Sequence, residues 1–284
     1  MSYGDGIINS MFFADQNTLF TSSIENNNSL TYGDPSINVY DYHTLQTGEA
    51  ARYTRNNLVT DLQNIIYANR PTEIFTMSYY DTHDDHSATY SFVTEVIGNL
   101  KQDYNYHPLL HESVVHGQYG IEWPIEYDNY SPAPTPVPFT NPFPANNVPL
   151  YWANATKIQL TDDMLANKYA AIGEYESQMG AASYNYAFYK SDEFYWTKDY
   201  ANIASTATVT ASTQNTSTNQ IAENVIDGYI AGHDMHEDMY RYEWASYNET
   251  VGAWIQLSFN DTYSVNKVIF NDRINNTDNI VAVR

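Results

Sequence analysis

The chain of 284 residues contains no cysteine, which excludes disulfide bonds and thiolate metal sites. Redox chemistry therefore gives no indication of the compartment. No run of about 18 apolar residues occurs, so we expect no membrane-spanning helix. Residues 1–20 lack the basic start and the apolar run of a signal peptide.

Basic residues are also scarce, with 12 Lys and Arg against 34 Asp and Glu and a formal net charge of −22. Such a surface repels phosphate backbones and anionic lipid headgroups, so nucleic acids and acidic membranes are not expected partners. Hydrophobic residues make up 43% of the chain, enough for a packed core. The length suits one large domain or two ordinary ones.

Hydrophobic periodicity predicts a layered α/β domain in the first two thirds of the chain. Apolar residues at helical spacing predict a helix over 54–69, and a short apolar run predicts a buried strand over 73–78. A second helix is expected over 86–100, with Asp84 or Asp85 as its N-cap. The order helix, strand, loop, helix is typical of α/β folds.

Less regular segments follow. The proline-rich tract 131–138 is expected to form a surface excursion. A further helix should begin after Thr161 and end near Gly180. One of its faces is expected to carry Leu165, Tyr169, Ile172 and Met179. The residues before position 53 are polar and turn-rich, and no element is assigned to them.

A change from helix-containing to β-favouring sequence near 199–205 indicates a domain boundary. Beyond it, β-favouring runs predict strands at 206–212, 254–259 and 265–270. We therefore expect an α/β domain followed by an all-β module.

The strongest chemical signal is Asp81-Thr82-His83-Asp84-Asp85-His86, which falls where a strand ends and a helix begins. Ligands of open α/β sheets bind at the carboxyl ends of strands. Two histidines three residues apart share one helical face, so one imidazole could bind a metal while the other acts as an acid or electrophile. A polar helix cap is the alternative explanation for these residues alone.

Further segments agree with one family pattern of strand, Asp-x-His-x-Asp-His loop and helix. These segments are 71–78, 81–86, 88–93, 116–117, 122–124, 168–178 and 188–196. Together they resemble the PIG-L/LmbE-like deacetylase family, especially its fungal multidomain members, over about 10–200.

The resemblance implies an incomplete Rossmann-like layered domain over 1–202 that hydrolyses N-acetyl amides of N-acetylglucosamine-type sugars with zinc. His86 is then expected to be a zinc ligand. His83 is expected to stabilise the tetrahedral intermediate or protonate the leaving amine, with Asp85 as its orienting partner. An extracellular location is implied by the same resemblance.

Family members also carry an Ala-His-Pro-Asp-Asp-Glu motif, which supplies the other zinc ligands and the general base. This sequence contains no such segment. A catalytic zinc ion normally needs three protein ligands. We therefore expect the chain as given to be inactive, as a fragment or a degenerate relative. The alternatives are a non-catalytic carbohydrate-binding protein and a gene-model fragment.

The C-terminal module resembles a second family through segments 224–228, 243–246, 253–257 and 272–273 with Asp278. Their order is similar to that in discoidin or coagulation-factor type C domains, which are galactose-binding-like β-sandwiches. The resemblance implies an incomplete glycan-binding sandwich over 203–284, with calcium near Asp227 in some relatives. Trp244 and Trp254 are expected in its core. The histidine pair in 233–236 is expected at the surface.

Overall fold

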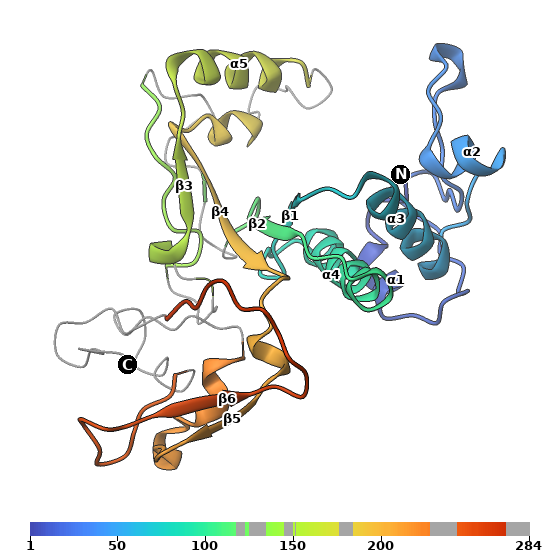
Figure 1. Cartoon of the computed structure of the whole chain (residues 1–284). Coiled ribbons are helices and arrows are strands. Elements are labelled where there is room, and N and C mark those ends of the chain that lie inside the picture. The colour runs from blue at the N-terminus through green and yellow to red at the C-terminus, as the bar shows by residue number, and fades with distance from the viewer. Residues whose placement is uncertain are drawn as a thin grey trace. The chain divides into compact units, whose positions relative to one another are not determined.

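The computed structural model describes residues 1–117, 123–124, 135–144, 150, 152–175, 184–227 and 243–270. The chain divides into two compact units (Figure 1). Unit 1 comprises residues 1–146 and 156–200, and unit 2 comprises residues 147–155 and 201–284. Helices and strands both occur, so the chain belongs to the mixed α/β class.

Unit 1 holds the longer helices and a four-stranded sheet. Its α-helices are α1 (Ile8–Phe12), α2 (Tyr42–Thr47), α3 (Arg55–Asn69), α4 (Asp84–Tyr104) and α5 (Asp162–Gly173). Its strands are β1 (Glu73–Met77), β2 (Leu109–Ser113), β3 (Thr156–Gln159) and β4 (Asp192–Asp199). The sheet order is β1-β2-β4-β3; β1 and β2 are parallel, and the other neighbours are antiparallel. β1, α4 and β2 therefore form a βαβ unit whose two strands end at the same edge.

The expected helix over 54–69 is confirmed as α3, and a strand is confirmed within 73–78 as β1. The expected burial of that strand was wrong, because none of its residues is fully buried and Glu73 and Phe75 are exposed. The side chain of Thr54 accepts a hydrogen bond from the Asn57 amide at the start of α3, and Arg70 adopts a left-handed conformation at its end.

Helix α4 is longer than the expected 86–100, because it begins at Asp84 and ends at Tyr104. The expected N-cap was wrong: His83 occupies that position and makes no side-chain cap bond. Asp84 and Asp85 lie instead in the first turn, where the helix dipole favours negative charge.

Two buried faces of α4 connect the layers of unit 1. Phe92 and Val96 lie on one face, toward the clusters that include α1 and α3. Val93 and Ile97 lie on the other face and pack against Leu110 of β2. Neighbouring residues of α4 therefore point to different layers, since successive helical residues are rotated by about 100°.

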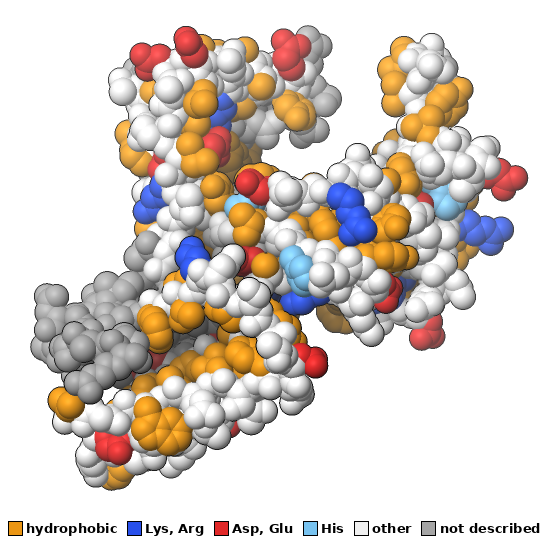
Figure 2. All heavy atoms as spheres, viewed as in Figure 1, with side chains coloured by type: hydrophobic (Ala, Val, Ile, Leu, Met, Phe, Trp, Pro, Cys, Tyr) orange, Lys and Arg blue, Asp and Glu red, His pale blue; other side chains and the backbone are white. Residues whose placement is uncertain are grey.

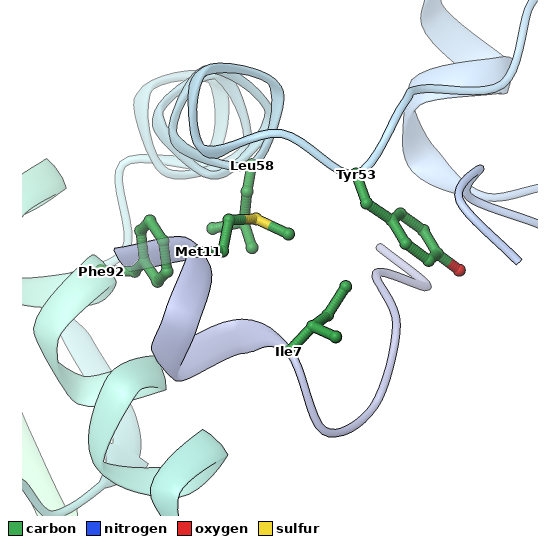
Figure 3. Close-up of a cluster of buried hydrophobic side chains, with 5 residues drawn as sticks. All are labelled: Ile7, Met11, Tyr53, Leu58 and Phe92. Carbon is green, nitrogen blue, oxygen red and sulfur yellow. The ribbon is translucent and has the colours of Figure 1, made fainter. Parts of the chain in front are cut away.

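The cluster between α1, α3 and α4 consists of Ile7, Met11, Tyr53, Leu58 and Phe92 (Figure 3). Met11 and Tyr53 are completely buried. The Tyr53 hydroxyl still finds a partner, because it donates a hydrogen bond to Glu25 over 2.8 Å. This cluster ties the N-terminal segment, which the sequence left unassigned, to the βαβ unit.

Helix α5 begins as expected, since the Thr161 side chain accepts a hydrogen bond from the Met164 amide. It ends at Gly173 rather than near Gly180, which lies outside the described residues. None of its residues is fully buried. The first half of the proline-rich tract, residues 131–134, lies outside the described residues as well.

Unit 2 contains the antiparallel pair β5 (Thr208–Ala211) and β6 (Ile255–Ser258), which confirms two of the three expected strands. Residues 265–270 form no strand, because no described segment pairs with them. Trp254 is 50% exposed, so its assignment to the core was wrong; strand alternation places it on the same face as the exposed Gln256. Trp244 is half-buried and donates its indole N–H to the Thr213 carbonyl. Among all described residues, no helix is long and apolar enough to cross a membrane.

The importance of the α1–α3–α4 cluster can be tested with two leucines on helices. Leu58 is 5% exposed and Leu45 is 64% exposed. We expect Leu58→Ala to lower the free energy of unfolding of unit 1 by about 2–5 kcal/mol, because a buried cavity forms. Leu45→Ala should change it by less than about 0.5 kcal/mol. Urea unfolding followed by circular dichroism at the helical band measures both, and equal losses would contradict the assigned core.

Candidate functional site

Two loops meet at the edge where β1 and β2 both end. The first loop runs from Ser78 to His83 and leads into α4, and the second runs from Val114 to Gly117. Thr82 links them, because its amide donates to the His116 carbonyl over 3.0 Å and its hydroxyl donates to the Gly117 carbonyl over 2.7 Å. The parallel pairing of the strands thus places residues far apart in sequence side by side.

The Asp81 carboxylate joins the two loops beneath the histidines. Its Oδ2 accepts from the amides of Val115 and His116 over 2.8 and 3.0 Å. Its Oδ1 accepts from the His83 amide over 3.0 Å and lies 3.2 Å from His86 Nδ1. The Asp81 side chain is fully buried, so these contacts replace the water that a carboxylate requires.

Three imidazole rings gather above this carboxylate. The ring centroids are 4.5 Å apart for His83 and His86, 5.1 Å for His86 and His116, and 5.4 Å for His83 and His116. His83 is exposed, whereas His86 and His116 are half-buried. We call these three residues the histidine cluster.

The second loop is fixed from its outer side by aromatic residues. A Cβ at Gly117 would lie 2.8 Å from the Pro142 carbonyl and 3.2 Å from the Trp123 ring, so only glycine allows this close approach. Tyr184 stacks on His116 with ring centroids 5.9 Å apart and donates its hydroxyl to the Trp123 carbonyl over 2.8 Å. The sequence segments that contain His116 and Trp123 therefore meet at one place.

The environment sets different proton affinities within the cluster. Burial lowers the pKa of His116 below its ordinary value; Asp81 opposes this shift, and the two neighbouring histidines add to it. Burial alone would raise the pKa of Asp81, but hydrogen bonds from His86 and the loop amides outweigh it and lower that pKa. The site thus combines an ionised carboxylate with an imidazole that favours its neutral form.

The structure brings two of the three expected site residues together. His83 and His86 both belong to the histidine cluster. Asp85 is buried on the face of α4 that is directed toward α1, away from the histidines. Its carboxylate accepts from the amides of Gly6 and Ile8, over 2.6 and 3.0 Å, at the start of α1. Within the histidine cluster, it is the carboxylate of Asp81 that contacts a ring, that of His86.

Asp81 and His116 received no catalytic role from the sequence. Asp81 begins the histidine-containing run, and His116 lies 30 residues beyond His86 in the chain. The available signal was positional, because each residue follows one of two strands that pair in parallel. Only the pairing of β1 with β2 shows that the two positions are neighbours.

The zinc ion implied by the family resemblance finds one suitable ligand. His86 is oriented by a buried carboxylate through Nδ1, as zinc-bound histidines commonly are, which leaves Nε2 for a metal. No group of three His, Cys, Asp or Glu among the described residues is arranged to hold a metal ion. The described residues therefore do not fit a complete zinc site. The histidine pair in 233–236 lies outside them.

Comparison with known families gave one match, in which residues 202–284 fit the model of a domain of unknown function (DUF7402). No curated protein and no solved structure matches the chain. The matched segment is also the one whose sequence resembles discoidin-type domains, and that resemblance stays a prediction, as does calcium near Asp227.

A second buried carboxyl group, that of Glu112, contacts the start of the first loop. The Ser78 hydroxyl donates to Glu112 over 2.7 Å and accepts from the Tyr80 amide over 3.1 Å. Burial raises the pKa of Glu112, although the Ser78 hydrogen bond and the charge of Lys198 oppose the shift. Folding therefore shifts this acid toward its neutral form.

This raised pKa predicts a pH-dependent effect of Glu112→Gln. When the pKa of a carboxyl is higher in the folded than in the unfolded state, ionisation of that carboxyl destabilises the folded state. The loss of stability grows as the pH rises above the pKa of the unfolded state. The glutamine variant should therefore match the wild type near pH 4 and gain relative stability toward pH 8. Glu49→Gln, at an exposed side chain, is the matched control for the substitution itself. Urea midpoints across this pH range measure the effect, and a relative loss of stability at high pH would contradict it.

Proposed function

We propose that unit 1 is a hydrolase domain that acts on the N-acetyl amide of N-acetylglucosamine-type sugars, with the histidine cluster around the reacting group. The observation that carries the proposal is the position of three imidazoles, one of them bound to a buried carboxylate, at the carboxyl ends of two neighbouring parallel strands. The sequence resemblance supplies the reaction and the substrate class. It also favours an extracellular location.

Amide hydrolysis needs a group that accepts a proton from the attacking water and a group that donates one to the leaving amine. His116 suits the first role, because its lowered pKa keeps a large share of it neutral near pH 7. His86 is oriented by Asp81 through Nδ1, which leaves its other nitrogen free for the substrate side. The exposed His83 lies beside both and suits the polarisation of the amide oxygen.

Zinc enters this proposal through the resemblance alone, and the chain has no segment like the first metal motif. The general base and two of the expected ligands belong to that motif in the family. We therefore propose that residues 1–284 bind an N-acetylated sugar at the histidine cluster but release acetate slowly or not at all.

Substrate binding at the cluster is tested by adding the tetramer of N-acetylglucosamine to the protein and recording the histidine ring signals by NMR. The signals of His83, His86 and His116 should move together, and His86→Ala should weaken binding about tenfold. His107 is the matched control, because it is exposed and lies before the opposite end of β2. Unchanged cluster signals at saturating sugar would refute the proposed site.

Metal content and acetate release test the chemistry separately. With zinc added, residues 1–284 should bind it weakly, and His86→Ala should bind less than the wild type. His83→Ala should retain the zinc content of the wild type, and His107→Ala likewise. Rapid zinc-dependent acetate release by residues 1–284 would show that further ligands exist and would contradict the expected inactivity.

A further inference from the structure

The sheet of unit 1 has a second face, directed away from α4. Ile74 of β1 packs toward the α4 clusters, so Glu73 and Phe75 lie on the opposite face by strand alternation. The Phe75 side chain is 65% exposed and the Glu73 side chain is 54% exposed. A large exposed ring on the first strand is unusual for a sheet that needs cover on both faces, and it indicates a contact surface.

Three rings from neighbouring strands contact one another on this face. Phe75 stacks on His111 with centroids 4.5 Å apart, and Tyr195 meets His111 edge-on at 4.6 Å. Phe75 and Tyr195 are themselves 5.6 Å apart. The rings come from β1, β2 and β4, so the sheet fixes their spacing. We call Phe75, His111 and Tyr195 the aromatic row.

His111 has a hydrogen-bonding atom that the fold does not satisfy. The residue is 5% exposed, and its Nδ1 lies 2.8 Å from the Thr197 hydroxyl. Its Nε2 is buried without a hydrogen-bond partner, although Glu73 Oε2 lies 3.4 Å away. The contact is therefore electrostatic and poorly directed. It keeps the Glu73 carboxylate beside the row, with much of that side chain open to solvent, and a buried unpaired polar atom of this kind calls for an explanation.

We propose that the aromatic row and Glu73 bind a cationic amino-sugar chain, the class of product that deacetylation would generate. The apolar face of a sugar ring can cover Phe75 and Tyr195, and the free ammonium of the sugar can meet both the Glu73 carboxylate and the ring faces. The choice of sugar rests on the proposed function. The site itself rests on the row and its carboxylate.

The charge of the whole chain favours the same ligand. A net charge of −22 attracts a polycation over long distances. Acidic side chains are spread over the face drawn in Figure 2 rather than gathered in one place. Long-range attraction therefore does not by itself determine where a polycation binds. The binding position is determined locally, by the combination of the exposed Phe75 ring with the Glu73 carboxylate.

The test is calorimetric titration of residues 1–284 with the hexamer of glucosamine, which is cationic, and with the hexamer of N-acetylglucosamine, which is neutral. We expect the cationic hexamer to bind, with affinity that falls as salt is raised. Phe75→Ala and Glu73→Gln should each weaken that binding about tenfold. The matched controls are Phe13→Ala, at a ring 77% exposed, and Glu174→Gln, at an exposed carboxylate; both should bind like the wild type.

Further outcomes separate this site from the histidine cluster. His86→Ala should leave the cationic hexamer bound, so loss of binding in that variant would overturn the assignment to the aromatic row. If Glu174→Gln weakened binding as much as Glu73→Gln, the weakening would reflect net charge alone. That result would also overturn the assignment to the aromatic row. Hexalysine that binds as tightly, with the same sensitivity to Phe75→Ala, would exclude a sugar as the selected ligand. Circular dichroism of each variant confirms that it is folded.

Discussion

The candidate site depends on one buried carboxylate. Asp81 accepts hydrogen bonds from two amides of the second loop and one of its own loop, and it contacts the ring of His86. An ionised carboxylate without water is stable only when such donors surround it. The loops must therefore meet in this arrangement for Asp81 to be buried, and once they do, two imidazoles are fixed in relation to one another. The arrangement of the imidazoles and the folding of the two loops are in this way coupled through a single side chain.

Helix α4 connects the candidate site to the rest of unit 1. Asp85 and His86 are neighbours in sequence, but the first binds amides at the start of α1 and the second faces the histidine cluster. The Asp85 contacts join residues 77 and 79 positions apart. The N-terminal segment is thereby held against the helix whose first turn carries the cluster. A role for Asp85 in the site would act through this packing rather than through contact with a histidine.

Local patterns predicted the elements whose signals are local. Helix α3 and strand β1 have regular apolar spacing and were found within one residue of their expected ends. Helix α1 has only five residues and is stabilised by Asp85, which lies far along the chain. No local sequence pattern therefore predicts this helix. Strand β2 contains His111 and Glu112, which do not resemble a buried strand. Their hydrogen-bond partners come from elsewhere in the chain: Thr197 of β4 for His111 Nδ1, and Ser78 of the first loop for Glu112.

The site was predictable to the same extent. The spacing of His83 and His86 placed them on one side of a helix start, and the structure agrees. The contribution of His116 and Asp81 depends on the parallel pairing of β1 with β2, which spacing does not reveal. Phe75 was expected in a buried strand over 73–78 but is exposed, because a run of six residues does not show which of its faces is covered.

The most direct test of this account is the nitrogen NMR spectrum of the histidine side chains in Asp81→Asn, with Asp85→Asn as the matched variant. An amide cannot accept all the hydrogen bonds of the carboxylate. In Asp81→Asn we expect altered Nδ1 signals for His86 and altered signals for His116, with the His107 signals unchanged. Asp85→Asn should leave the His86 signal close to that of the wild type. Unaltered His86 and His116 signals in a folded Asp81→Asn protein would contradict the claim that this carboxylate organises the histidine cluster.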